Sequence, residues 1–298
     1  MRRHEQRGVA VVTALLMTAL AVSIVAGLFW QQQVQIRLVD NQRLRMQEEW
    51  LLRDMLDWAQ WVLIQDDRQS SIDYEGETWS RPLSGMPIAS NVAQAVLRGT
   101  VSDAQGRFNL NNLSDEGQID PIETATFARL LSGQNIAAQL AQATAQSIAN
   151  LQRRNTSNAR NPQMRLWQLD DLLSIPGYTP AMLRRLRAFV VVLPESTPVN
   201  VNTAPAEVIA ALYGIALPEA AAIVEERRRA YFRDGADFSN RMERRNLPQA
   251  GGQITFSSHF FVVDSEIHFG PAALQSQALM QRDSGQVQVL WRRNGDLS

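Results

Sequence analysis

Residues 7–30 read RGVAVVTALLMTALAVSIVAGLFW, and this stretch decides the class of protein to which the chain belongs. No charged residue occurs from Val9 to Trp30. A helix of about 22 residues is roughly 33 Å long, and the hydrocarbon core of a bilayer is about 30 Å thick. The stretch therefore predicts a transmembrane helix over residues 9–30.

The charges that precede this helix predict its orientation. Arg2, Arg3 and Arg7 all lie on its N-terminal side. By the positive-inside rule, the N-terminus is then cytoplasmic and the bulk of the chain lies across the membrane. In a Gram-negative bacterium this is a single-pass protein of the inner membrane with a periplasmic soluble domain.

Three interpretations of the N-terminus fit these residues. The first is an ordinary signal anchor. The second is a secretory signal peptide removed after Ala19-Leu20-Ala21, which has the small-x-small pattern of a cleavage site. The third is a prepilin leader over residues 1–8, cleaved between Gly8 and Val9 so that the apolar helix stays on the mature protein.

The residues after the apolar run favour the prepilin leader. No Pro or Gly occurs between Gly27 and Gly76, and residues 31–65 are polar but favour helix. Apolar residues there recur at spacings of four, three and four, which is one face of a helix: Leu51, Met55, Trp58 and Val62. One helix over residues 9–65 would hold about 57 residues and measure roughly 85 Å.

Three segments carry a resemblance to a known family. They are residues 7–16 (RGVAVVTALL), residues 106–113 (GRFNLNNL) and residues 198–204 (PVNVNTA). The first resembles a prepilin processing site, and the other two are similar to segments of the minor pseudopilin K family, the general secretion pathway protein K of type II secretion systems. In this order and at these separations, the three segments identify the chain as a member of that family.

The resemblance implies a function and several site residues. A prepilin peptidase would cut after Gly8 and N-methylate Val9. Most pilins carry a glutamate at the fifth mature position, which is Thr13 here, and a hydroxyl has no charge with which to neutralise a neighbouring N-terminal amine. The family lacks this glutamate because its member sits at the tip of the pseudopilus, in contact with the minor pseudopilins I and J.

The expected fold is α+β, with a pilin-like long N-terminal helix packed on an antiparallel sheet and a large inserted all-helical domain. Residues 31–65 continue the N-terminal helix, and residues 66–108 form the first part of the pilin-like domain. Residues 109–250 form the inserted helical domain, and residues 251–298 form a C-terminal β-meander.

Local patterns predict some of these elements. A strand is expected near residues 92–102, and three more over 260–269, 274–280 and 286–291, with a turn at Asp283-Ser284-Gly285. Asp120-Pro121 should open one helix, Thr203 should cap another, and residues 155–163 should form a loop. Asp170 and Asp171 are interpreted as helix caps.

Two short segments of the helical region suggest an alternative function, that of a membrane-anchored helix-hairpin-helix protein that binds nucleic acid. Each hairpin-like segment precedes an Arg-rich helix: Gly177 precedes Arg184, Arg185 and Arg187, and Gly214 precedes Arg227, Arg228 and Arg229. Neither hairpin has the second glycine that lets backbone N–H groups approach a phosphate. We therefore expect no nucleic-acid partner and interpret these arginines as residues of solvated helix faces.

Composition narrows the function further. The net charge is −1 and the chain has no cysteine, so disulfides, thiolate metal sites and cysteine nucleophiles are excluded. The three histidines, His4, His259 and His268, have no metal-ligand spacing, and residues 146–162 have Arg where a calcium loop of the family would need Asp. We expect no metal, no cofactor and no enzymatic activity.

Overall fold

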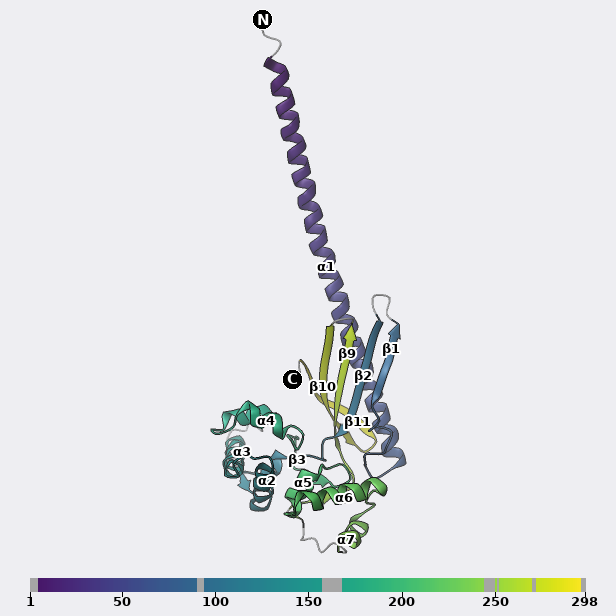
Figure 1. Cartoon of the computed structure of the whole chain (residues 1–298), viewed down its shortest axis with the longest axis vertical. Helices are drawn as coiled ribbons and strands as arrows, with labels where there is room; N and C mark the ends of the chain where they lie inside the picture. Colours follow the sequence, from purple (N-terminus) through teal and green to yellow (C-terminus); the bar gives the residue numbers. More distant parts are fainter. Residues whose placement is uncertain are drawn as a thin grey trace. The chain divides into compact units, whose positions relative to one another are not determined.

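The chain divides into two compact units in its computed structural model (Figure 1). The first is Met1–Asp54 and the second is Met55–Ser298. The structure describes residues 5–89, 94–156, 168–243, 250, 252–269 and 272–295.

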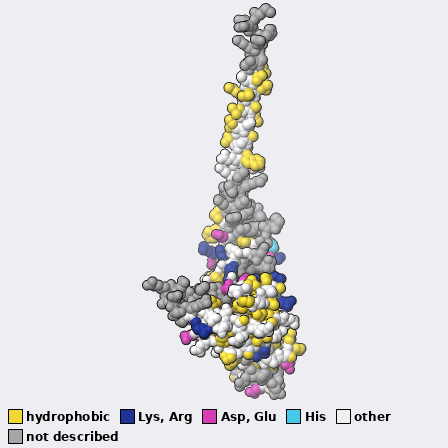
Figure 2. Space-filling view, turned by 90° about the vertical axis from the view of Figure 1, so that its left-hand side faces the viewer, with side chains coloured by type: hydrophobic (Ala, Val, Ile, Leu, Met, Phe, Trp, Pro, Cys, Tyr) yellow, Lys and Arg dark blue, Asp and Glu magenta, His cyan; other side chains and the backbone are white. Residues whose placement is uncertain are grey.

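The first unit consists of the first part of helix α1, which runs from Glu5 to Gln69. Within it, the 23-residue segment Val11–Gln33 is long and apolar enough to cross a bilayer. An 18-residue window of this segment has a mean hydropathy of 2.4, and none of that window is buried. Apolar side chains are visible along this part in Figure 2. The helix predicted over 9–65 is confirmed and extends by four residues at each end. The positive charge of Arg68 in its last turn interacts favourably with the negative C-terminal end of the helix dipole.

The second unit contains a five-stranded antiparallel sheet in the order β1-β2-β9-β10-β11 (Figure 1). Its strands are β1 (Leu83–Ala89), β2 (Gln94–Asp103), β9 (Phe260–Phe269), β10 (Ala272–Asp283) and β11 (Gln286–Asn294). The predicted strands are confirmed. So is the predicted turn between β10 and β11, where Ser284 and Gly285 both have positive φ, as a two-residue hairpin turn requires.

The last part of α1, within the second unit, packs on this sheet. Met55 is fully buried, and a Cβ added at Gly99 of β2 would lie 2.0 Å from its Cε atom. A glycine at residue 99 therefore lets helix and strand approach closely. Farther along the helix, the Gln60 side chain donates to the carbonyl oxygen of Val287 on β11 at 3.2 Å. The pilin-like packing of a long helix on an antiparallel sheet is confirmed.

All the helices that follow α1 lie between β2 and β9 in the sequence. They are α2 (Pro121–Gly133), α3 (Leu140–Thr156), α4 (Pro180–Leu186), α5 (Ala206–Tyr213), α6 (Leu217–Arg229) and α7 (Gly235–Glu243), with the 3-10 turns Leu110–Leu113 and Leu169–Ser174. They enclose a core of their own, in which Phe108 stacks on Phe127 with ring centroids 5.4 Å apart.

Three two-stranded pairs join this helical region. They are parallel β3 (Phe108–Asn109) with β6 (Val190–Val191), antiparallel β4 (Ser114–Asp115) with β5 (Gln118–Ile119), and parallel β7 (Val199–Asn200) with β8 (Ile254–Thr255).

The helix ends confirm some predicted caps and correct another. Asp120 caps α2, because its carboxylate accepts from the backbone N–H groups of Ile122 and Glu123. The prediction that Thr203 caps a helix is wrong. Helix α5 begins at Ala206 with Pro205 in the cap position, and the Thr203 hydroxyl donates instead to the carboxylate of Asp103.

Two further predictions around α3 and the second 3-10 turn have mixed outcomes. Helix α3 reaches Thr156, inside the loop predicted over 155–163, and the rest of that loop lies outside the described residues. Asp171 does cap a turn, because it accepts from the backbone N–H of Gln168 at 3.1 Å. Asp170 instead pairs with Arg187 at 3.2 Å.

Candidate functional site: a buried polar junction and the apolar helix

Asparagine side chains of the family-like segment 106–113 bind the residues that immediately precede the second such segment, 198–204. Asn109 donates to the Thr197 hydroxyl at 3.1 Å and accepts from the Leu193 N–H at 3.1 Å. The Asn112 amide donates to the carbonyl of Thr197 at 2.8 Å and accepts from its N–H at 2.9 Å. Asparagine offers both a donor and an acceptor, so each side chain satisfies backbone groups of the strand-free residues 193–197. These asparagines hold the start of the helical region against residues 193–197, which follow α4 and β6.

Gly106 lies where the first of these segments meets the second. A Cβ added there would lie 2.8 Å from the Thr203 hydroxyl oxygen and 3.0 Å from the Thr203 carbonyl carbon and oxygen. The nearest atoms include backbone, which cannot rotate away as a flexible side chain can. The close approach therefore requires glycine at this position.

Asn200 is the centre of the junction between the helical region and the pilin-like part. Its buried side-chain nitrogen lies 2.9 Å from the Asp103 carboxylate, 3.0 Å from the Ser258 hydroxyl and 3.0 Å from the Asp73 carbonyl oxygen. These partners come from the end of β2, the residues before β9 and the loop after α1. One amide therefore connects three segments that are far apart in the sequence.

Asp103 shares this buried site. Its carboxylate accepts from the hydroxyls of Thr203 and Ser258 and from the backbone N–H of Gln105. Burial raises the pKa of Asp103, and the hydrogen bonds from Thr203 and Ser258 oppose that rise.

The Arg282 guanidinium lies among three carboxylates of this junction, and no other guanidinium of the described residues does so. Its nitrogens lie 2.8 Å from Asp66 at the end of α1, 2.6 Å from Asp73 and 3.7 Å from Asp67. It also donates to the Ser258 carbonyl oxygen at 2.9 Å and lies over the Phe261 ring, 4.7 Å from its centroid. A buried charge needs such partners, so Arg282 fixes the positions of α1, its following loop and β10.

The acidic groups around Arg282 outnumber it. Asp66, Asp73 and Glu77 have carboxylate oxygens within 4.8 Å of one another, an arrangement that could in principle hold a metal ion. The Arg282 guanidinium supplies the positive charge at Asp66 and Asp73. Burial, with the charges of Glu77 and Asp73, raises the pKa of Asp66 to about 7. Asp66 is therefore partly protonated near neutral pH.

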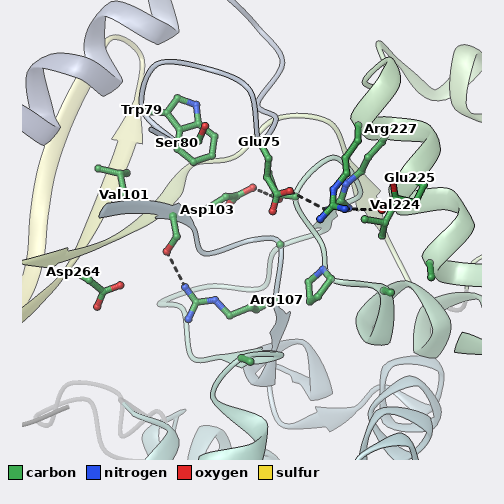
Figure 3. Close-up of a pocket in the computed structure, with 18 residues that line it drawn as sticks. Glu75, Trp79, Ser80, Val101, Asp103, Arg107, Val224, Glu225, Arg227 and Asp264 are labelled. Carbon is green, nitrogen blue, oxygen red and sulfur yellow. Dashed lines mark hydrogen bonds and ion pairs between the residues drawn. The ribbon is translucent and has the colours of Figure 1, made fainter. Parts of the chain in front are cut away.

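The Arg-rich helices of the hairpin-like segments differ in their exposure. Arg227 is buried and donates to the carbonyl oxygens of Val201 and Ala204, and its guanidinium lies 3.6 Å from Glu75 (Figure 3). The interpretation of every one of these arginines as solvated is therefore wrong for Arg227. Arg228 is exposed and pairs with Glu225 at 2.6 Å. A buried arginine whose guanidinium binds carbonyl oxygens within the same domain is not available to a phosphate.

The hairpin shape itself is present. Helices α5 and α6 meet at 119°, with Gly214 in the left-handed conformation at φ 63°. Gly177 likewise has a positive φ, 106°, just before α4. The likeness to helix-hairpin-helix modules is thus one of backbone geometry.

The N-terminal site residues lie in the first unit. Gly8, Val9 and Thr13 are all in the α1 backbone, and Thr13 is exposed among apolar residues. The polar junction, in contrast, is built wholly from residues of the second unit.

Two family profiles described as "Type II secretion system (T2SS), protein K" match residues 106–195 and 199–257. The type II secretion system protein K of Pseudomonas aeruginosa is 30% identical to the chain, over 98% of this chain and 94% of that protein. The chain belongs to the type II secretion system protein K family. A protein K from Pectobacterium carotovorum is 23% identical over 98% of each chain.

A solved structure has a fold similar to that of this chain. The match is to a chain in the crystal structure of the GspK-GspI-GspJ complex from the type 2 secretion system of enterotoxigenic Escherichia coli. The TM-score is 0.62 and the identity 18%, over 87% of this chain and 99% of that one. The predicted α+β fold is thereby confirmed. The predicted family is confirmed by the profile matches and the 30% identical relative, and the chain is a pseudopilin component of a type II secretion system.

Sequence reasoning found the protein K segments but not what they contact. It missed Asp66, Asp73, Ser258 and Arg282, which complete the junction. A partial signal exists for Arg282, because it follows ten uncharged residues, Ala272 to Gln281, in a predicted strand region. An arginine near the end of such a strand suggests a buried acidic partner, although its position in the sequence stays unknown.

Replacing Gly106 by alanine should lower the free energy of unfolding by about 1–3 kcal/mol, because the new methyl group would overlap the Thr203 backbone. Gly133→Ala is the matched control, since no atom lies within 4 Å of a Cβ built there. Denaturant unfolding of the full-length chain in detergent would measure both. Equal stability of the two variants would contradict the close contact.

Asp66 should give the stability of the protein a pH dependence. Its folded pKa of about 7 lies above the ordinary value of 3.8, so the folded state binds more protons than the unfolded state between these values. The contribution of Asp66 is therefore fully present below pH 3.8 and is lost as the pH rises to about 7.

The variant Asp66→Asn should consequently lower the free energy of unfolding less at pH 8 than at pH 5. Denaturant unfolding of the variant and the wild type at both pH values would measure this difference. The exposed Asp115→Asn variant is the control. A difference for Asp66→Asn that does not change with pH would show that the carboxyl group titrates normally.

Proposed function

We propose that the chain is a minor pseudopilin that anchors in the inner membrane and assembles at the tip of the type II secretion pseudopilus. The observation that carries the proposal is α1, which is one helix from Glu5 to Gln69. Its apolar Val11–Gln33 segment is exposed, while its last residues pack on a sheet. Exposed apolar surface of this extent needs lipid or other helices to cover it.

The proposed topology follows from the charges around this segment. Arg2, Arg3 and Arg7 precede it, which favours a cytoplasmic N-terminus before processing and a periplasmic second unit. A prepilin peptidase would cut between Gly8 and Val9 and methylate the new amino group of Val9. The apolar helix then stays on the mature protein, so the subunit can leave the lipid only by packing into a filament.

The tip position is supported by Thr13. A carboxylate in the hydrocarbon region is costly unless a cation pairs with it, so a glutamate there favours a subunit whose neighbour offers an N-terminal amine. Thr13 has no such charge to satisfy. A subunit without this carboxylate suits the end of a filament, where one neighbour is missing.

The partners we propose are the minor pseudopilins I and J. The solved structure with a matching fold is described as a GspK-GspI-GspJ complex, and this chain covers 99% of the matching chain in it. The role is one of structure and assembly, without catalysis or cofactor. The inward orientation of Arg227 weighs against the nucleic-acid alternative, despite the hairpin at Gly214.

The proposal is tested with the full-length chain produced beside its prepilin peptidase and the I and J proteins of the same secretion system. We expect a mature protein that begins with N-methylated Val9, stays in the inner-membrane fraction and co-purifies with I and J in detergent. A mature protein that begins at Val22 and is free in the periplasm would contradict it.

The variant Thr13→Glu tests the tip position in the same preparation. It should fold and be processed normally, but it should reduce secretion or alter the stoichiometry of the tip complex. A Thr13→Ser variant is the control, because it keeps an uncharged hydroxyl. If Thr13→Glu leaves secretion and complex formation unchanged, the residue has no special role at the tip.

A further inference from the structure

Arg107 lies on the seam between the sheet and the helical region of the second unit. It follows β2 by four residues and lines two hollows on this seam. The larger hollow, of about 780 Å³, is drawn in Figure 3, where the Arg107 side chain extends between Asp264 of β9 and the helical region. The smaller, of about 320 Å³, lies between the 3-10 turn Leu169–Ser174 and strands β10 and β11.

Arg107 has no carboxylate partner among the described residues. Its guanidinium makes a long hydrogen bond of 3.4 Å to the Ser102 hydroxyl. Asp264 and Asp103 attract it from a distance, but Asp264 accepts from the Gln277 amide at 2.8 Å and Asp103 belongs to the junction described above. Burial lowers the pKa of Arg107, which reflects a guanidinium held partly out of water.

The smaller hollow is basic around Arg107. Arg187 and Arg293 also line it, and the one acidic residue of its lining is Asp170. Arg187 pairs with Asp170 at 3.2 Å, and Arg293 lies over the Trp291 ring at 4.5 Å. The lining of this hollow therefore contains three guanidinium groups and one carboxylate.

The remaining walls of the hollow are largely apolar. They include Val190, Val192, Val262 and Trp291, which come from the helical region and from both central and edge strands of the sheet. A ligand that matches this lining combines an anionic group with an apolar stem or neighbour. A glutamate or aspartate side chain on a protein segment has this composition.

We propose that the smaller hollow is a docking site for an acidic side chain of a partner subunit, with Arg107 as its main contact. A guanidinium and a carboxylate form two parallel hydrogen bonds, and such a pair is stronger where water is partly excluded. The inference rests on the proposed function, because it takes the partner to be one of the I and J subunits of the tip complex.

The test is the affinity of the full-length chain in detergent micelles for the I and J proteins. Arg107→Gln should weaken binding by about 30-fold or more, since truncating one partner of a desolvated charge pair typically has at least this effect. Arg107→Lys keeps the charge but loses the planar fork and should give an intermediate affinity.

Two control variants separate docking from folding. Ser102→Ala removes the internal hydrogen bond of Arg107 but no contact with the partner. It should leave the affinity within about threefold of the wild type, because one long hydrogen bond contributes little. Arg228→Gln removes an exposed arginine that is already paired with Glu225 and should bind like the wild type. Near-ultraviolet circular dichroism and the thermal midpoint check that each variant is folded.

A photo-crosslinking residue in place of Leu169, which lines the same hollow, identifies the partner segment. We expect a crosslink to a segment of I or J that contains Asp or Glu. Neutralising that carboxylate should weaken binding as Arg107→Gln does, and combining the two should add little further loss, because both remove the same pair.

Several outcomes would overturn the inference. They are unchanged affinity of folded Arg107→Gln, additive losses in the double variant, and a crosslink only within the chain itself. If Arg107→Gln does not fold, the partner variant and Arg107→Lys decide the question by the same criteria. Failure of the wild-type chain to bind I and J would refute the proposed function and this inference together, whereas normal assembly of Arg107→Gln would refute this inference alone.

Discussion

The second unit depends on the burial of one positive charge, the guanidinium of Arg282. Burying an arginine is costly unless carboxylates and carbonyl oxygens surround it, and here these come from the end of α1, from the loop after it and from the residues before β9. The side chain can be satisfied only if all these segments are in place. It therefore links the end of α1 and the loop that follows it to strand β10 of the sheet.

Asn200 extends the same constraint to the helical region. It contacts Asp103, Ser258 and the Asp73 carbonyl, so the junction built around Arg282 continues into the segment that precedes α5. Arg227 adds a second link by binding the carbonyls of Val201 and Ala204. The inserted helices are thereby linked to the pilin-like part by polar groups. Apolar packing adds to this link, because Leu193 of the helical region lies in one cluster with Phe260 and Leu279 of the sheet.

The two parts of α1 suit different contacts. The apolar segment offers a surface for lipid or neighbouring helices, whereas the last part of the helix is held on the sheet by Gln60 and Asp66. On the proposed function, the apolar segment packs in the membrane or in a filament, and partner contacts such as the one proposed at Arg107 belong to the second unit.

Patterns of short range predicted the elements well. The uncharged run from Val9 to Trp30, the alternation in residues 260–291 and the Asp120-Pro121 pair each reflect interactions within a few residues, so the chain alone reveals them. The predictions for Thr203 and Arg227 were wrong because the neighbouring sequence indicated a local role for each. In the fold, each side chain binds a partner that is distant in the sequence. Thr203 bonds Asp103, which lies 100 residues away, and Arg227 turns towards Val201 and Ala204.

The resemblance to protein K supplied the fold and the family, but family-like segments alone do not say which atoms they contact. Asn109, Asn112 and Asn200 were recognised as part of these segments, and only the structure shows that they bond backbone groups and the buried carboxylate of Asp103. Arg282 and Asp73 are 209 residues apart, and no local pattern links them.

The free energy of unfolding of Arg282→Met tests this account most directly, measured by denaturant on the full-length chain in detergent with exposed Arg292→Met as the control. Methionine keeps the apolar stem but leaves Asp66 and Asp73 buried without their cation. We predict a loss of about 3–5 kcal/mol for Arg282→Met and within about 0.5 kcal/mol for the control. Equal stability of the two variants would contradict the claim that this buried charge holds the second unit together.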